Sequence, residues 1–175
     1  MGFEYNWQNN EANFGPPTQN EVDGGTHVTV DILLKKEDKY FALRRQCVPG
    51  HEAPPHSPDH PMELLFICHN LIRYAEPIEQ CVQRIVKEQS GVNVLSYQVE
   101  DLRTTFLEES GGKKIKQWAV IPFIIAEVDK TPEVGNYGNE VTEVVSFTKN
   151  NIPVDFAFEK RELIERIINR RNRLS

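Results

Sequence analysis

The sequence has few of the features that would place it outside the ordinary globular proteins. Its three cysteines, Cys47, Cys68 and Cys81, form no CxxC pair and no even set, which indicates free thiols in a reducing compartment. The longest apolar stretch, residues 118–126, is interrupted by a proline and is too short to cross a bilayer. Residues 1–14 lack the basic and apolar regions of a signal peptide. We therefore expect a cytoplasmic protein without a membrane segment.

An excess of positive charge is also missing. The chain has 20 basic and 26 acidic residues, for a net charge of −6, which favours solubility and gives no overall attraction to nucleic acid. Basic residues do gather in residues 160–173, but glutamates are interspersed there. Basic residues near the end of a helix also stabilise it by interacting with the helix dipole, so they do not by themselves indicate nucleic-acid binding. The sequence thus argues against nucleic acid as a partner.

The length of 175 residues suits one domain with a tail. Residues 1–25 are polar and rich in Asn, Gly and Pro, which predicts a flexible N-terminal arm. Phe3, Tyr5 and Trp7 alternate in this arm with the period of a strand that buries one face. Three such aromatic side chains would suit a subunit interface, so we predict a homodimer through the arm. The domain itself is expected over residues 26–173.

Within this domain, strands and helices do not alternate regularly, which favours an α+β fold over a parallel doubly wound sheet. Residues 26–45 have the pattern of a β-hairpin. Apolar residues at spacings of three and four predict a helix over about residues 77–90 and a second, C-terminal helix over about residues 158–172. Between hairpin and helix, residues 48–61 hold five prolines and three histidines. We interpret them as a mobile surface insertion loop rather than a zinc site, because the spacing matches no known site.

Residues 70–92, NLIRYAEPIEQCVQRIVKEQSGV, resemble the Nudix box, G-x5-E-x7-R-E-U-x-E-E-x-G-U, in which U is aliphatic. Six of the nine defined positions agree without a gap. The matching residues are Glu76, Arg84, Val86, Glu88, Gly91 and Val92, and the departures are Asn70, Ile85 and Gln89. The hairpin before the box and the strand and helix near the end of the chain are similar to the same family. The resemblance implies a Nudix-type α/β/α sandwich with a mixed sheet.

The resemblance also implies a reaction, the hydrolysis of a nucleoside diphosphate linked to another group X with Mg²⁺ or Mn²⁺. In the family, carboxylates at the positions of Ile85, Glu88 and Gln89 share one helix face and hold the metal. Here Ile85 marks a lost ligand, and Gln89 offers only a weak amide oxygen. Glu88 stays a candidate for both metal binding and catalysis, and Glu140, outside the box, is a second catalytic candidate.

Glu76, Arg84 and Gly91 match the box at positions that we interpret as structural. The first two are expected to orient the helix against the preceding loop. Glycine after the last helical residue is the usual way to end a helix. Their presence predicts that the scaffold is kept, whether or not the reaction is.

The helical period further predicts how this segment lies. The helix should pack between sheets through Val82 and Val86, while Ile85 and Glu88 should face a cleft.

Two functions follow from these observations. The first, which we prefer, is a Nudix-like domain with a degenerate metal site that binds a nucleotide or a protein partner with little or no hydrolysis. The alternative is a divergent Nudix hydrolase that recruits relocated ligands, such as Glu88, Gln89 and Glu140, for its metal. The sequence does not identify the ligand, because members of one fold differ in the sites that they carry.

Overall fold

The computed structural model describes residues 26–45, 65–73, 75–110, 113–134, 141–157 and 160–171. The predictions of a flexible arm over residues 1–25, of a homodimer through that arm and of a mobile loop over residues 48–61 lie outside these residues. They stay predictions.

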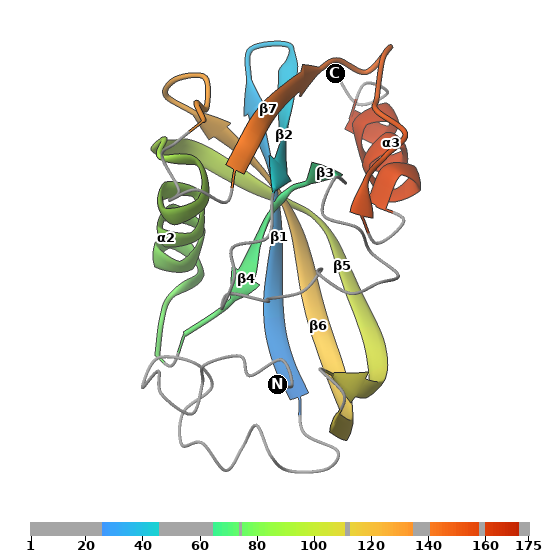
Figure 1. The fold of residues 1–175 in the computed structure, drawn as a ribbon. Helices are drawn as coiled ribbons and strands as arrows, with labels where there is room; N and C mark the ends of the chain where they lie inside the picture. The colour runs from blue at the N-terminus through green and yellow to red at the C-terminus, as the bar shows by residue number, and fades with distance from the viewer. Residues whose placement is uncertain are drawn as a thin grey trace.

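In the described part of the chain, seven strands form one sheet with a helix on each face (Figure 1). In chain order the elements are β1 (Thr26–Lys36), β2 (Lys39–Arg45), β3 (Leu65–Phe66), β4 (Cys68–Leu71), α2 (Ile78–Ser90), β5 (Val94–Ser110), β6 (Lys113–Val128), β7 (Val141–Phe147) and α3 (Lys160–Arg171). The predicted α+β sandwich is confirmed, and both predicted helices are present. Neither described helix is long and apolar enough to cross a membrane.

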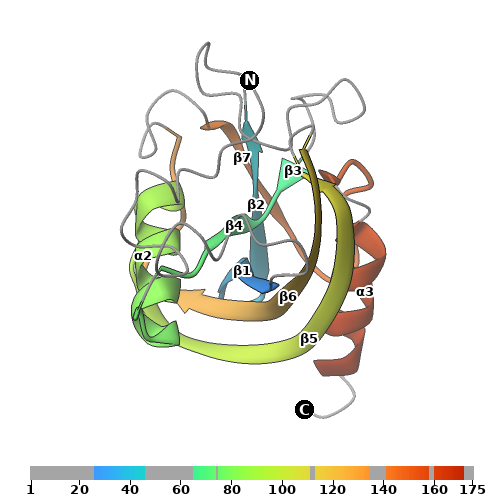
Figure 2. The same ribbon diagram turned by 90° about the horizontal axis from the view of Figure 1, so that it is seen from below.

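The sheet is mixed because β1 pairs differently along its two edges. One edge runs parallel to β6, and the other is antiparallel to β4 near the start of β1 and to β2 near its end. β2 extends the sheet through β3 and β7, and β5 pairs with β6 antiparallel. β5 and β6 curve together past β1 (Figure 2). β1 is therefore the strand to which the rest of the sheet is attached.

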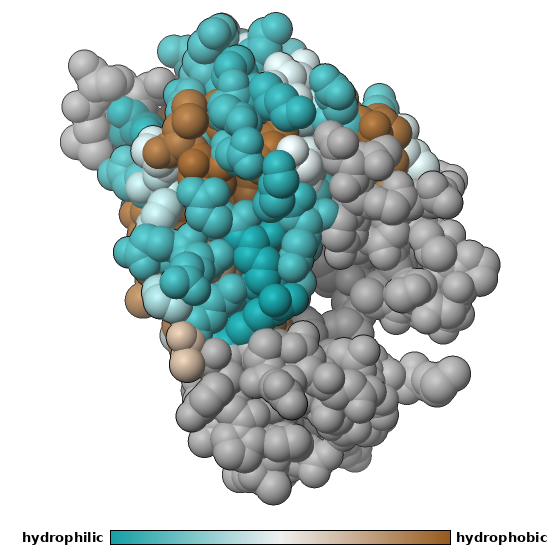
Figure 3. All heavy atoms as spheres, turned by 90° about the vertical axis from the view of Figure 1, so that its left-hand side faces the viewer, coloured by the Kyte–Doolittle hydropathy of each residue, from teal (hydrophilic) through white to brown (hydrophobic). Residues whose placement is uncertain are grey.

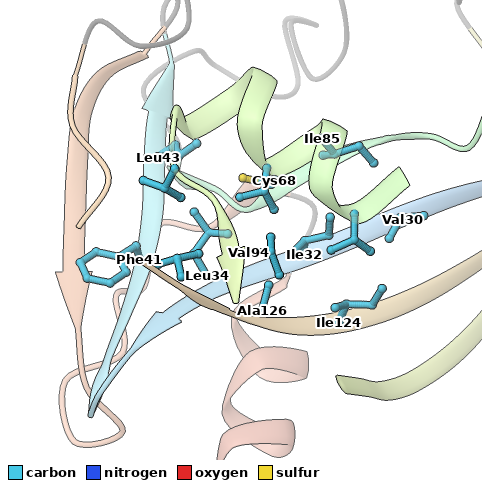
Figure 4. Close-up of a cluster of buried hydrophobic side chains, with 14 of the residues drawn as sticks. Val30, Ile32, Leu34, Phe41, Leu43, Cys68, Ile85, Val94, Ile124 and Ala126 are labelled. Carbon is cyan, nitrogen blue, oxygen red and sulfur yellow. The ribbon is translucent and has the colours of Figure 1, made fainter. Parts of the chain in front are cut away.

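Side chains alternate along β1 between two hydrophobic clusters. Val30, Ile32 and Leu34 belong to the cluster beneath α2, part of which is seen in Figure 4. Leu33 belongs to the cluster beneath α3. Because both faces of β1 are covered, a polar side chain in its middle has no direct access to water. Asp31 occupies such a position and is completely buried.

The helix α2 is amphipathic. It buries Cys81, Val82, Ile85 and Val86, whose spacing of one, three and one residues follows the helical period. Polar residues cover most of its opposite side, which faces the viewer in Figure 3. The helix ends at Ser90, and Gly91 follows with φ 70° while its N–H donates to Lys87 O at 3.1 Å. This left-handed conformation is one that a side chain with a Cβ disfavours.

Substitution of Gly91 by alanine should therefore lower the free energy of unfolding by about 1 kcal/mol, because a Cβ clashes in the left-handed region. Urea unfolding followed by circular dichroism measures this change. Ser96→Ala, at an exposed position of β5, is the control and should change stability by less than about 0.5 kcal/mol. Equal stability of the two variants would contradict the role given to Gly91.

Candidate functional site

Ile85 lies in the core rather than at a cleft. Its side chain is fully buried in the hydrophobic cluster between α2 and the sheet, together with Val30 and Cys68 (Figure 4). The prediction that Ile85 faces a cleft is wrong. The physical reason is that an isoleucine gains about 1.5–3 kcal/mol by leaving water, and the sheet offers an apolar surface next to it. The prediction that the helix packs through Val82 and Val86 is confirmed, since both are fully buried in the same cluster, but the described strands form one sheet, so the helix does not lie between sheets.

Gln89 binds the backbone of β4. Its Oε1 accepts a hydrogen bond from His69 N at 2.9 Å, and its Nε2 donates to His69 O at 2.7 Å. The amide thus satisfies one backbone donor and one backbone acceptor at the same residue. A carboxylate at this position would accept from the N–H but would also face the carbonyl oxygen, a second acceptor. Gln89 is consequently engaged without any cation.

Glu88 is held by two arginines. Its Oε2 lies 3.3 Å from Arg84 Nη1, and its Oε1 lies 3.4 Å from Arg73 Nη2. The side chain is 37% exposed, so water reaches it and each pair is weak. Even so, positive charge surrounds the one remaining carboxylate of the three box positions.

Glu76 and Arg84 form the stronger pair. Arg84 Nε donates to Glu76 Oε1 at 2.6 Å, and Arg84 Nη2 donates to Glu76 Oε2 at 2.8 Å, which is the bidentate geometry. Arg84 Nη2 also donates to Leu71 O, and Glu76 accepts from Arg73 N. Burial alone would raise the pKa of Glu76, but the hydrogen bonds from Arg84 and Arg73 hold that pKa below its usual value. These bonds join the segment between β4 and α2 to the helix itself.

The donor set on this helix does not fit Mg²⁺ or Mn²⁺. Magnesium takes about six oxygen ligands and is usually held through carboxylates. The box positions offer an isoleucine in the core, an amide that bonds the backbone and a carboxylate between two arginines. Within the described ranges, no group of three or more His, Cys, Asp or Glu side chains is placed to hold a metal ion. Glu140, the second catalytic candidate, lies outside the described residues.

A second polar cluster surrounds Asp31. This carboxylate accepts from His69 Nδ1 at 2.7 Å, Arg103 Nη2 at 2.8 Å and Lys160 Nζ at 2.5 Å. The three donors come from β4, β5 and α3. Burial alone would raise the pKa of Asp31, but Lys160 and His69 bring it well below its usual value. Burial also lowers the pKa of Lys160, against the opposing effect of Asp31.

The sequence reasoning did not single out this cluster. From the sequence, Asp31 falls within the hairpin predicted over residues 26–45. One signal was present, since Asp31 stands between Val30 and the apolar run Ile32–Leu34. Such a run is typical of a strand that is buried on both faces, and an aspartate within it needs partners inside the protein.

Comparisons with solved structures identify the fold. No protein-family model matches the sequence, and no curated protein matches it significantly. Solved structures do match: the MutT Nudix hydrolase from Burkholderia pseudomallei aligns at 16% identity with a TM-score of 0.59, over 80% of this chain and 96% of that one. A MutT protein from Methanosarcina mazei Go1 aligns at 15% identity with a TM-score of 0.61, over 86% and 98%. A Nudix hydrolase from Nitrosomonas europaea aligns at 15% identity with a TM-score of 0.59, over 85% and 89%.

The chain has the Nudix fold. Identities of 15–16% show the fold and leave the activity open. Within this Nudix fold, α2 carries the box-like sequence, and the Asp31 cluster lies on the other face of the sheet, toward α3. His69 takes part in both places, through its backbone in the first and through its side chain in the second.

Substitution of Asp31 by asparagine should lower the free energy of unfolding by about 3–5 kcal/mol, because it removes the buried charge with which Lys160 and Arg103 are paired. Chemical denaturation measures the loss. Glu143→Gln is the control, because Glu143 forms a more exposed ion pair with Arg44 whose removal should cost less than about 1 kcal/mol. Similar losses in the two variants would show that the Asp31 cluster does not stabilise the fold.

Substitution of Ile85 by glutamate should destabilise the protein by more than about 3 kcal/mol, because it buries a carboxylate in an apolar cluster. Ile85→Val at the same position should cost only about 0.5–1.5 kcal/mol. Thermal unfolding of both variants at neutral pH gives the comparison. If Ile85→Glu were as stable as Ile85→Val, the side chain would have to face solvent, as the sequence had predicted.

Proposed function

We propose that this protein is a Nudix-fold domain that binds a nucleotide or a related phosphate-bearing ligand and hydrolyses it very slowly or not at all. The proposal rests on the contacts of Ile85, Glu88 and Gln89, the three box positions at which the family has carboxylates. Ile85 is in the core, Gln89 bonds the backbone of His69, and Glu88 is paired with arginines. Ile85 has no ligand atom, the Gln89 amide is bonded to the backbone, and the two arginines beside Glu88 disfavour a metal ion there.

The chemistry of the reaction supports this conclusion. Metal ions promote phosphoryl chemistry by neutralising the charge that develops on the phosphate oxygens and by activating a water. Loss of a residue that merely orients a ligand typically costs about 10–100-fold in metal affinity or activity. Replacement of two ligating carboxylates should cost more. The fold, in contrast, is kept by contacts that need no metal, such as the Glu76–Arg84 pair.

A ligand-binding role agrees with a fold that is kept without a metal ion. Nudix hydrolases act on nucleotide derivatives, and the fold alone suggests the same class of ligand for this chain. The two described cysteines, Cys68 and Cys81, are both buried. We propose a cytoplasmic protein, as the odd number and the spacing of its three cysteines favour.

The test is a screen of nucleoside diphosphate derivatives with Mg²⁺ and with Mn²⁺, in which release of phosphate or pyrophosphate is measured. We expect turnover of the wild-type protein to equal that of Glu88→Gln, while calorimetry in EDTA detects binding of at least one compound. Glu79→Gln, on the exposed side of α2, is the matched control.

Robust turnover that disappears in Glu88→Gln and persists in Glu79→Gln would overturn the proposal. It would establish the divergent hydrolase instead, with Glu88 as a metal ligand and others, such as Glu140, supplied from elsewhere in the chain.

A further inference from the structure

The Asp31 cluster brings three donor side chains to one buried carboxylate. Arg103 and Lys160 each form an ion pair with Asp31, and His69 adds a third donor through its Nδ1. Lys160 is also the first described residue of α3. The positive end of the helix dipole therefore lies close to the same place.

The four side chains differ in how much of each is exposed to solvent, which shows which end of the cluster lies inside the protein. Asp31 is 0% and Lys160 is 12% exposed, whereas Arg103 is 34% and His69 is 37% exposed. The carboxylate is thus at the closed inner end, and the two outer groups that meet the solvent are hydrogen-bond donors. An anion that approaches from outside meets Arg103 and His69 before it meets Asp31.

Arg103 also has an unused donor. Its Nη2 is bonded to Asp31, but its Nε–H is shielded from water and has no hydrogen-bond partner among the described residues. Buried donors of this kind are rare, because each costs free energy unless an acceptor is present. The planar guanidinium is suited to donating from two nitrogens to the oxygens of a phosphate or a carboxylate.

We propose that Arg103, Lys160 and His69 form a binding site for an oxyanion, with Asp31 as the buried counter-charge that holds the three donors in place. The site takes the phosphate or carboxylate group of a ligand, which satisfies the free Nε–H of Arg103. It lies on the α3 side of the sheet, away from the box positions on α2. The inference deepens the proposed ligand-binding function and rests on it for its role, but binding of an oxyanion needs no metal and no hydrolysis.

The experiment is a titration of the full-length, metal-free protein with inorganic phosphate, followed by calorimetry and by amide chemical shifts. We expect saturable binding with shifts at His69, Arg103 and Lys160. Arg103→Gln should weaken it about tenfold, because one charge-assisted hydrogen-bonding group is lost. Arg166→Gln, which removes the same charge from an exposed position on α3, should leave the affinity unchanged.

A parallel titration with acetate distinguishes the two sources of oxyanion. Tighter binding of phosphate assigns the site to a phosphate group, and tighter binding of acetate assigns it to a carboxylate; either result supports the proposal. Equal affinity of Arg103→Gln and Arg166→Gln for both anions, or no saturable binding, overturns it. Turnover in the hydrolysis screen, with phosphate still bound at Arg103, would refute the proposed function alone.

Discussion

Asp31 carries a negative charge in the middle of the central strand, where helices cover both faces and hydrogen-bonded strands occupy both edges. A charge at such a place is tolerated only when other groups are brought to it. They come from positions 38, 72 and 129 residues further along the chain. The placement of β4, β5 and α3 around β1 is therefore tied to one carboxylate, in addition to the apolar packing of the two clusters.

The box segment is held in place by contacts within the protein. The bidentate Glu76–Arg84 pair and the left-handed Gly91 fix the beginning and the end of α2 through local bonds. None of these bonds involves a metal ion. Along the same helix, Gln89 bonds the backbone of β4 and Glu88 lies beside two arginines.

His69 contacts both the Asp31 cluster and the box segment on α2. Gln89 bonds both polar atoms of its backbone, and Asp31 accepts from its side chain. A shift of α2 would move the strand β4 through the first contact and would alter the donors around Asp31 through the second. The two faces of the sheet are thus linked by contacts as well as by the strand that they share.

The sequence by itself determined the parts of this protein that depend on local period and turn chemistry. The hairpin of β1 and β2, the amphipathic helices and the glycine that ends α2 were all predictable, because spacing and residue type act within a few positions. Only the tertiary structure decided that Ile85 is in the core and that Asp31 accepts hydrogen bonds from three side chains. A local pattern reports which side chains share a face but does not report what covers that face. For Ile85 the covering is the sheet, and for Asp31 it is α3 and β5, which come from distant parts of the chain.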